Sequence, residues 1–141
     1  MSETRAVVAV YTDGGARGNP GPAAIGAVVL DPTTDPPTRL AAVSERIGIA
    51  TSNVAEYRAV IAGLEAALAF PSHTLRVRAD SMLVIRQLEG VWKVKKEHLR
   101  PLHARARELL ASWAEVDLAH VRREENLDAD LLVNAALDAP A

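Results

Sequence analysis

The sequence predicts a mixed α/β sheet, in which an antiparallel meander is followed by strands joined through crossover helices. Two observations predict this fold class. Short apolar runs separated by turn-forming residues fill the first third of the chain. Further on, segments with apolar residues at helical spacing alternate with short strands, an order typical of parallel pairing. With 141 residues and 49% apolar composition, we expect one domain with a sizeable core.

The first three strands are predicted at residues 7–11, 23–30 and 39–49. The first is continuously apolar, which is typical of a strand covered on both faces. It ends at Asp13, after which we expect a loop rich in glycine and proline as far as Pro22. Prolines at 32, 36 and 37 end the second strand, because proline removes a backbone donor. The third alternates apolar and polar residues, which predicts a half-exposed strand.

The rest of the chain alternates helices and strands. Helical spacing predicts a helix over residues 54–70, which Pro71 ends. A strand at 74–79, a helix at 81–88, a long helix at 97–113, a strand at 116–121 and a helix at 126–137 follow. We therefore expect a domain over residues 1–138, and a tail or the start of a linker at 139–141.

Composition narrows the possible functions. The chain has no cysteine, which excludes disulfides and thiolate zinc sites and is compatible with the cytoplasm, where we expect the protein to act. Residues 1–5 lack the basic and apolar pattern of a signal peptide, and no apolar run is long enough to span a bilayer. We expect a monomer without membrane contact. The net charge of −2 gives no general argument for nucleic acid.

Four acidic residues stand where predicted elements begin or end, and each has an ordinary structural interpretation. Asp13 could form an Asx turn with the glycines that follow it. Glu56 could complete a capping box with Asn53 as the N-cap residue. Asp80 could cap the next helix, and Asp130 could stabilise the last helix by interacting with the positive end of its dipole.

The predicted topology favours a common site. Asp13 and Asp80 both follow parallel strands, and ligand sites of open α/β sheets form at the carboxyl ends of such strands. We expect Glu56 to reach this edge only if its helix runs obliquely. Converging carboxylates repel one another unless cations intervene, and oxygen ligands suit Mg²⁺ or Mn²⁺. His98 and His103 are five positions apart and do not share a helix face, so zinc is not expected.

Four motifs, each carrying one acid, give the chain a family resemblance over nearly its whole length. They are residues 11–22 (YTDGGARGNPGP), 51–57 (TSNVAEY), 79–81 (ADS) and 126–134 (NLDADLLVN). The glycine-rich motif lacks the Lys-Ser/Thr ending of a nucleotide P-loop. In this order, the motifs resemble those of the type 1 ribonucleases H, in the subgroup without a basic handle.

The resemblance implies a ribonuclease H-like, five-stranded mixed sheet flanked by helices. It implies an endonuclease that hydrolyses the RNA strand of RNA–DNA hybrids with two Mg²⁺ ions, for which Mn²⁺ may substitute, giving 5′-phosphate and 3′-hydroxyl ends. Asp13, Glu56, Asp80 and Asp130 would be the catalytic metal ligands. Asp13 would bridge both ions, and Glu56 would also contact the 2′-hydroxyl beside the scissile phosphate. The Ala-Asp-x-Leu pattern selects Asp130 rather than Asp128.

The resemblance also implies substrate contacts. Backbone amides of the loop after Asp13, together with Asn19, would contact sugar and phosphate. Thr51 would contact a DNA phosphate and Asn53 a base edge. Ser52 replaces a second asparagine that is common in the family, and Met82 replaces a glutamine, so the side chains at these two minor-groove positions differ from those of the family. The expected contacts in these motifs are Gly14, Gly15, Ala16, Asn19, Thr51, Ser52 and Asn53.

The loop before the last acid lacks the histidine that many relatives carry there. His120 precedes this loop, but it falls in the predicted strand, where we expect a structural role. Arg123 is the candidate for the histidine's task. Arginine stays protonated at neutral pH, so its catalytic role would be electrostatic.

In place of the family's basic handle stands the segment that leads into the long helix. Trp92, Lys93, Lys95 and Lys96 are expected to contact the DNA strand by charge and stacking. Basic residues continue at helical spacing as Lys96, Arg100, His103 and Arg107, opposite the apolar face. The alternative interpretation of this stripe is a solvated helix face.

Two other functions remain alternatives: a different nuclease of the same fold, such as a resolvase or transposase core, and a non-catalytic nucleic-acid-binding domain. The glycine-rich motif and the Thr-x-Asn-x-x-Glu spacing favour the ribonuclease, and a binding domain would have no need of four acids. Some similar domains are fused in front of a phosphatase domain, so a C-terminal fusion of this type is a further possibility in the full-length protein.

Overall fold

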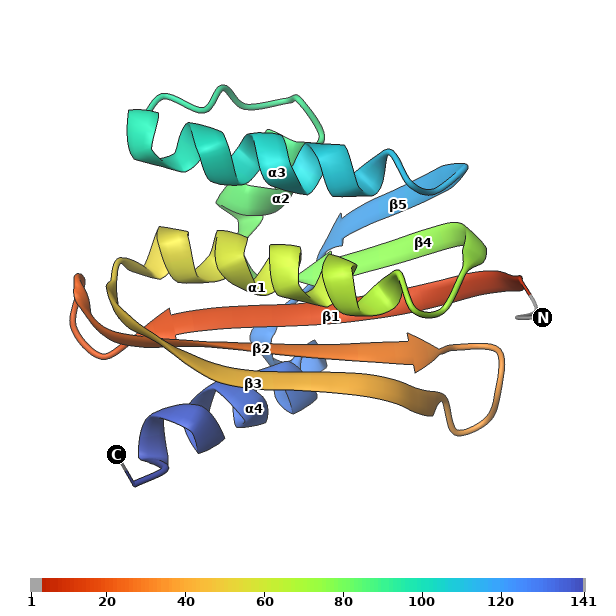
Figure 1. Ribbon diagram of the computed structural model, residues 1–141, viewed down its shortest axis with the longest axis horizontal. Coiled ribbons are helices and arrows are strands. Elements are labelled where there is room, and N and C mark those ends of the chain that lie inside the picture. The colour runs from red at the N-terminus through yellow and green to blue at the C-terminus, as the bar shows by residue number, and fades with distance from the viewer. Residues whose placement is uncertain (1–3, 141) are drawn as a thin grey trace.

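A computed structural model describes residues 4–140, which form one five-stranded sheet in the order β3-β2-β1-β4-β5 (Figure 1). The strands are β1 (Arg5–Ala16), β2 (Gly21–Asp31), β3 (Thr38–Ala50), β4 (Ser72–Ala79) and β5 (Glu115–His120). β1 pairs antiparallel with β2, and β2 with β3, whereas β4 pairs parallel with β1 and with β5. The predicted fold class is confirmed.

Helices cover both faces of this sheet (Figure 1). They are α1 (Ser52–Ala67), α2 (Met82–Leu88), α3 (Arg100–Leu110) and α4 (Leu127–Asp138), with short 3₁₀ turns η1 (Glu97–Leu99) and η2 (Arg123–Glu125). Side chains alternate between the faces of a strand. Val10 of β1 faces Gly63 of α1, whereas Gly15 of β1 faces Val133 of α4, so α1 and α4 lie on opposite faces.

The main core lies between the sheet and the layer formed by α1, α2 and α3. Its large, fully buried side chains include Leu64 of α1, Leu75 of β4 and Ile85 of α2. A smaller cluster beneath α4 contains Ala24 and Val133. α1 approaches the sheet closely at Gly63, where an added Cβ would lie 2.7 Å from a methyl group of Val10.

β1 is longer than the sequence predicts. The expected loop after Asp13 is wrong, because Asp13 pairs with Gly26 and the strand continues to Ala16. Gly14 serves close packing rather than a turn. A Cβ on Gly14 would overlap the backbone of Ala55 in α1, so only glycine lets this helix approach the strand.

The predicted long helix at 97–113 is also wrong in its bounds. It begins as η1, continues as α3 with Pro101 in its first turn, and ends at Leu110. Trp113 is buried beyond the end of the helix, so its apolar character reflects core packing rather than helix continuation.

The bounds expected for the domain, residues 1–138 followed by a tail at 139–141, stay a prediction. Residues 1–3 and 141 lie outside the described residues, and α4 ends at Asp138. Among residues 4–140, no helix has both the length and the hydrophobicity that crossing a membrane requires.

Candidate active site

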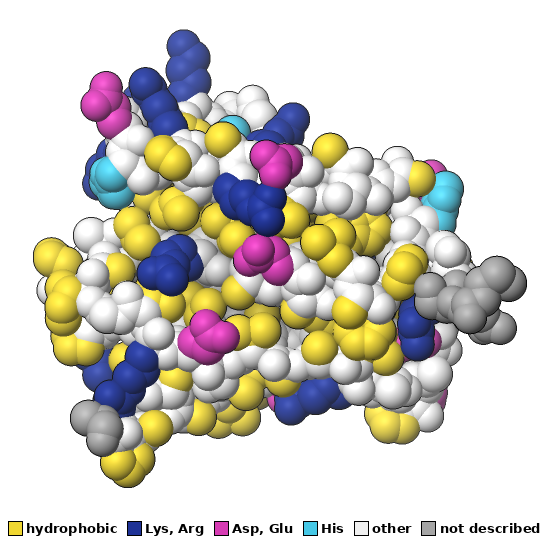
Figure 2. Space-filling view, in the orientation of Figure 1, with side chains coloured by type: hydrophobic (Ala, Val, Ile, Leu, Met, Phe, Trp, Pro, Cys, Tyr) yellow, Lys and Arg dark blue, Asp and Glu magenta, His cyan; other side chains and the backbone are white. Residues whose placement is uncertain are grey.

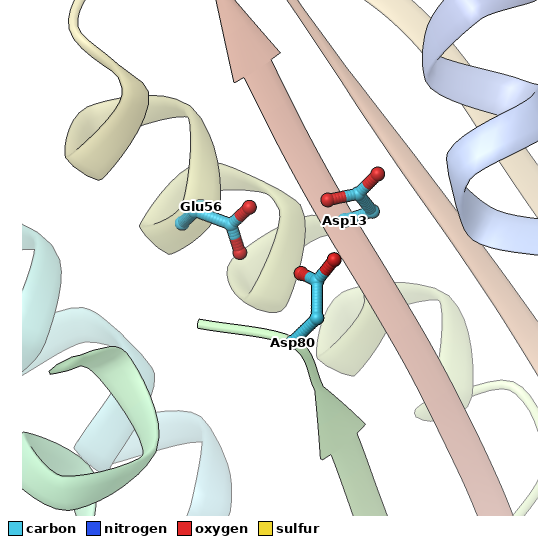
Figure 3. Close-up of side chains that lie close together, drawn as sticks. All are labelled: Asp13, Glu56 and Asp80. Carbon is cyan, nitrogen blue, oxygen red and sulfur yellow. The ribbon is translucent and has the colours of Figure 1, made fainter. Parts of the chain in front are cut away.

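Three acids from separate motifs converge in the structure. Asp13 comes from β1, Glu56 from α1 and Asp80 from the residue that follows β4. One carboxylate oxygen of each lies within 4.8 Å of the other two. Figure 3 shows the three side chains directed toward a common space. We call Asp13, Glu56 and Asp80 the acidic cluster.

Sheet topology explains how Glu56 reaches the carboxyl end of β1. β3 is antiparallel to β2, and β2 is antiparallel to β1, so β3 runs parallel to β1. The carboxyl ends of β1 and β3 therefore lie at the same end of the sheet. α1 begins at Ser52, directly after β3. Its first turns lie beside the end of β1, where Ala55 approaches the backbone of Gly14.

The alternative interpretation of Glu56, a capping box with Asn53 as the N-cap residue, is wrong. The N-cap residue of α1 is Thr51, whose hydroxyl accepts a hydrogen bond from the amide of Val54 at 3.3 Å, and not Asn53. Glu56 is thus two residues further into the helix than a capping box requires. Its Oε1 accepts a hydrogen bond from the amide of Gly14 at 3.1 Å, so its carboxylate is directed at β1 rather than at its own helix end.

Asp80 does not cap the helix that follows it. The N-cap residue of α2 is Ser81, whose hydroxyl accepts from the amide of Val84 at 3.3 Å. The carboxylate of Asp80 is therefore left for the acidic cluster. His120, the last residue of β5, places its Nε2 3.2 Å from the carbonyl oxygen of Asp80, a contact that supports the structural role expected for it.

Burial raises the pKa of all three acids, and the charges of neighbouring carboxylates add to this effect. Burial, followed by the charge of Asp80, raises the pKa of Asp13 to about 7. Burial, followed by the charge of Asp13, raises the pKa of Glu56 well above its usual range. The pKa of Asp80 is also raised, again chiefly by burial.

The donor set of the cluster fits a divalent cation. Glu56 Oε2 is buried and has no hydrogen-bond partner within residues 4–140. Such an atom is costly in a folded protein unless something binds it. A hard cation would bind this oxygen and remove the repulsion among the carboxylates, and all-oxygen ligands are those that Mg²⁺ and Mn²⁺ prefer.

Asp130 lies beside the acidic cluster, on α4. Hydrogen bonding and charge from Asp130 both contribute to the raised pKa of Asp13. Its carboxylate is 3.3 Å from the guanidinium of Arg123, a side chain that is 73% exposed. Asp128 is turned outward, with its side chain 66% exposed and 3.9 Å from the guanidinium of Arg39, as expected from the motif pattern.

Two residues of the glycine motif that we expect to contact the substrate, Gly14 and Asn19, form hydrogen bonds with the first turns of α1. Asn19 accepts a hydrogen bond from the amide of Ser52 at 3.0 Å, which places these two residues next to Thr51. Gly15 and Ala16 pair with β2 inside the sheet. The amide of Gly14 is already bonded to Glu56, so in this state it is not free for a phosphate.

A second group of predicted contacts lines one cleft. Asn53 of α1 and four residues of the segment between α2 and η1 face a cleft of about 440 Å³, namely Trp92, Lys93, Lys95 and Lys96. Basic side chains project at the upper end of the molecule, over the connection between α2 and α3 (Figures 1 and 2). Leu83, Gln87, Val91 and Leu99 complete the lining, so the cleft combines apolar and basic side chains.

The basic stripe is mostly exposed, but two of its residues bond to the backbone of α2. His103 is half-buried, and its Nε2 lies 3.0 Å from the carbonyl oxygen of Gln87. Arg107 donates to the carbonyl oxygen of Leu88 at 2.6 Å. His103 and Arg107 thus attach α3 to α2, although Arg107 remains exposed, as do Lys96 and Arg100.

Two buried polar residues were missed from sequence. Asn126, only 2% exposed, donates from Nδ2 to the carbonyl oxygen of Thr12 at 2.9 Å and so joins β1 to the helix of Asp130. Gln87, 5% exposed, is bonded to Tyr57 and to the cleft segment. The available signal for Gln87 was a polar residue among the apolar positions of α2.

Comparison with known proteins gives a consistent family. A family described as "Reverse transcriptase-like" matches residues 11–136. The N-terminal RNase H domain of Rv2228c from Mycobacterium tuberculosis, solved as a fusion with maltose binding protein, is 45% identical, with a TM-score of 0.88 over 94% of this chain and 99% of that chain. RNase H1 from Halobacterium salinarum is 45% identical, with a TM-score of 0.87 over 94% of this chain and 98% of that chain.

A third similar structure is LC11-RNase H1 in complex with an RNA/DNA hybrid. It is 40% identical, with a TM-score of 0.83 over 93% of this chain and 96% of that chain. Two of the relatives are longer at full length: the aligned region spans 36% of the mycobacterial bifunctional protein Rv2228c and 64% of the halobacterial ribonuclease HI. Motifs, fold, acidic cluster and relatives agree, and the chain belongs to the type 1 ribonuclease H family.

Proposed function

We propose that this chain hydrolyses the RNA strand of RNA–DNA hybrids and leaves 5′-phosphate and 3′-hydroxyl ends. The observation that carries the proposal is the approach of the carboxylates of Asp13, Glu56 and Asp80 to within 4.8 Å of one another. Family membership supports the reaction. The LC11 relative, solved with an RNA/DNA hybrid, supports the substrate.

Asp13, Glu56, Asp80 and Asp130 would hold two divalent cations, Mg²⁺ or, in its place, Mn²⁺. Such ions, when bound, lower the pKa of water and stabilise negative charge on phosphate oxygens. Glu56 would accept a hydrogen bond from the 2′-hydroxyl beside the scissile phosphate, the group that distinguishes RNA from DNA. Arg123 would place a fixed positive charge next to Asp130 and cannot itself carry protons at neutral pH.

The substrate would be held by two groups of residues. Backbone amides near Gly15 and Ala16, with Asn19 and Ser52, would contact the sugar–phosphate backbone. The DNA strand would be contacted by Thr51 and by five residues that line the cleft, namely Asn53, Trp92, Lys93, Lys95 and Lys96. Lysines would supply charge to phosphates, and the exposed indole would supply a stacking surface.

The test is a comparison of substrates with the purified chain. End-labelled RNA–DNA hybrid, single-stranded RNA, duplex DNA and junction DNA are incubated with Mg²⁺, with Mn²⁺ or with a chelator. We expect metal-dependent cleavage of the hybrid's RNA strand alone, with 3′-hydroxyl ends that a polymerase can extend. Asp13→Asn should abolish cleavage, whereas the matched charge change Asp128→Asn should preserve it.

Other outcomes identify the alternatives. Preferential cleavage of junction or duplex DNA would indicate a resolvase- or transposase-like nuclease. Hybrid binding without cleavage in either cation would indicate a non-catalytic binding domain. Either result would contradict the proposal.

We further propose a cytoplasmic monomer that can form part of a longer protein with a C-terminal phosphatase-type domain. The mycobacterial relative is described as bifunctional and is longer than this chain, which supports a fusion. The intact mass of the native gene product tests the fusion, and light scattering of the purified protein tests the monomer.

A further inference from the structure

Gln87 is a buried amide where α1, α2 and the segment leading to η1 meet. Its side-chain oxygen accepts a hydrogen bond from the hydroxyl of Tyr57 on α1. Its side-chain nitrogen donates to the backbone carbonyl of Lys93 at 3.1 Å. One side chain, only 5% exposed, thus connects the interior of the protein to the segment that forms the cleft.

The orientation of this amide follows from its partners. A backbone carbonyl can only accept, so the Gln87 atom that faces Lys93 must be the donor Nε2. The oxygen is then left to accept from Tyr57, and both ends of the amide are satisfied. Burying an amide costs free energy that an apolar side chain at this position would not incur. This cost points to a role for the polar contact in the shape of the segment that it holds.

The segment at residues 91–96, which we call the cleft loop, forms no helix or strand. At its beginning, the amide of Trp92 donates to the carbonyl of Arg86 at 3.2 Å. Further along, Arg100 donates to the carbonyl of Val94 at 3.3 Å. The contact from Gln87 lies between these two, at the carbonyl of Lys93. It fixes the peptide unit next to the side chains that line the cleft.

We infer that Gln87 is a positioning residue for hybrid binding, because its amide holds the cleft loop in the conformation that presents Trp92 and Lys93 to the nucleic acid. This inference rests on the proposed function. A loop that is ordered before binding loses less conformational entropy when the ligand arrives. The connection also joins the loop to Tyr57, the residue after Glu56, so the cleft and the acidic cluster share one helix.

The test is Gln87→Met, which keeps the length of the side chain and removes both hydrogen bonds. We expect KM for the hybrid to rise about tenfold, because several side chains must be ordered on binding, while kcat stays within about twofold. The same weakening should appear as a higher Kd in the Asp13→Asn background, where cleavage does not interfere. Amide hydrogen exchange of Trp92 should accelerate. Gln87→Leu repeats the test if the methionine variant does not fold.

A matched control separates loop order from general destabilisation. Val29→Ala removes volume from the main core on β2, a strand that carries neither Gln87 nor the cleft loop. It should lower the melting temperature and leave KM for the hybrid unchanged. An effect on KM equal to that of Gln87→Met would overturn the inference.

The remaining outcomes are decisive. Unchanged KM and Kd in a folded Gln87 variant would overturn the positioning role, and so would unchanged exchange at Trp92. A wild-type chain that does not bind the hybrid would overturn the proposed function itself, and the inference with it. Hybrid binding by the wild type with no loss in the variant would overturn only the inference.

Discussion

Replacing Asp13 with asparagine should stabilise the metal-free protein while it abolishes cleavage. Asp13 shares the acidic cluster with Glu56 and Asp80, and burial together with the charge of Asp80 raises its pKa to about 7. Without a cation, the ionised carboxylate is therefore unfavourable in the folded state. Asparagine has nearly the same shape and no charge, so it removes this repulsion.

The sign and size of the effect follow from proton linkage. The pKa of Asp13 is about 7 in the folded protein, against 3.8 for an ordinary aspartate. The folded state retains a proton that the unfolded chain has lost, so this stability is complete below about pH 4 and is lost as pH rises through about 7. A pKa difference of this size corresponds to at most about 4 kcal/mol. Because the neighbouring acids titrate together with Asp13, we expect a gain of about 1–3 kcal/mol for Asp13→Asn near pH 8.

The assay is urea denaturation in a chelating buffer near pH 8 and near pH 4, followed by the same series in Mg²⁺. The gain of Asp13→Asn over the wild type should appear near pH 8 and vanish near pH 4. Mg²⁺ should stabilise the wild type more than the variant. Asp128→Asn is the matched control, because it makes the same charge change at an exposed position. An Asp13→Asn protein that is less stable than the wild type near pH 8, or a gain of equal size at both pH values, would refute the reasoning.

Three further predictions concern other parts of the molecule. Arg123→Ala should lower kcat about tenfold, which corresponds to about 1.4 kcal/mol in the barrier, and leave Mg²⁺ affinity measured by calorimetry unchanged. Lys95→Ala combined with Lys96→Ala should reduce the slope of log Kd against log salt by about 1.8, because two phosphate contacts are lost. Gly63→Ala should lower the free energy of unfolding by about 1–2 kcal/mol, because the new methyl group would lie 2.7 Å from Val10.

Each of these has an outcome that contradicts it. Arg122→Ala is the control for Arg123, and equal losses of kcat in the two variants would remove the special role of Arg123. An unchanged salt slope would place the two lysines outside the binding surface. Higher stability of Gly63→Ala would mean that helix propensity, which favours alanine over glycine by about 1 kcal/mol, outweighs the close contact with β1.

Local structure was predictable wherever neighbours in sequence decide it. The apolar run before Asp13 gave a buried strand, and the helical spacing after Val54 gave α1. Proline and glycine residues marked most of the ends of the helices and strands. Predictions failed where a long-range contact replaced a local one. Asp13 was expected to end a strand, but pairing with β2 extends β1 beyond it. The alternative of Asn53 as the N-cap residue of α1 is wrong, because Thr51 has that role. Glu56 instead accepts a hydrogen bond from the amide of Gly14.

The sequence by itself determined the element order, the family motifs and the four acids, because each depends on residue type and spacing along the chain. Only the tertiary structure decided how those acids meet. β3 ends at the same edge as β1 because two antiparallel pairings restore its direction, and this brings Glu56 to Asp13. The tertiary structure also decided that His103 and Arg107 bond to α2 and that Gln87 holds the cleft loop. These contacts join residues that are distant in the chain, and no periodicity in the sequence encodes which partners such side chains find.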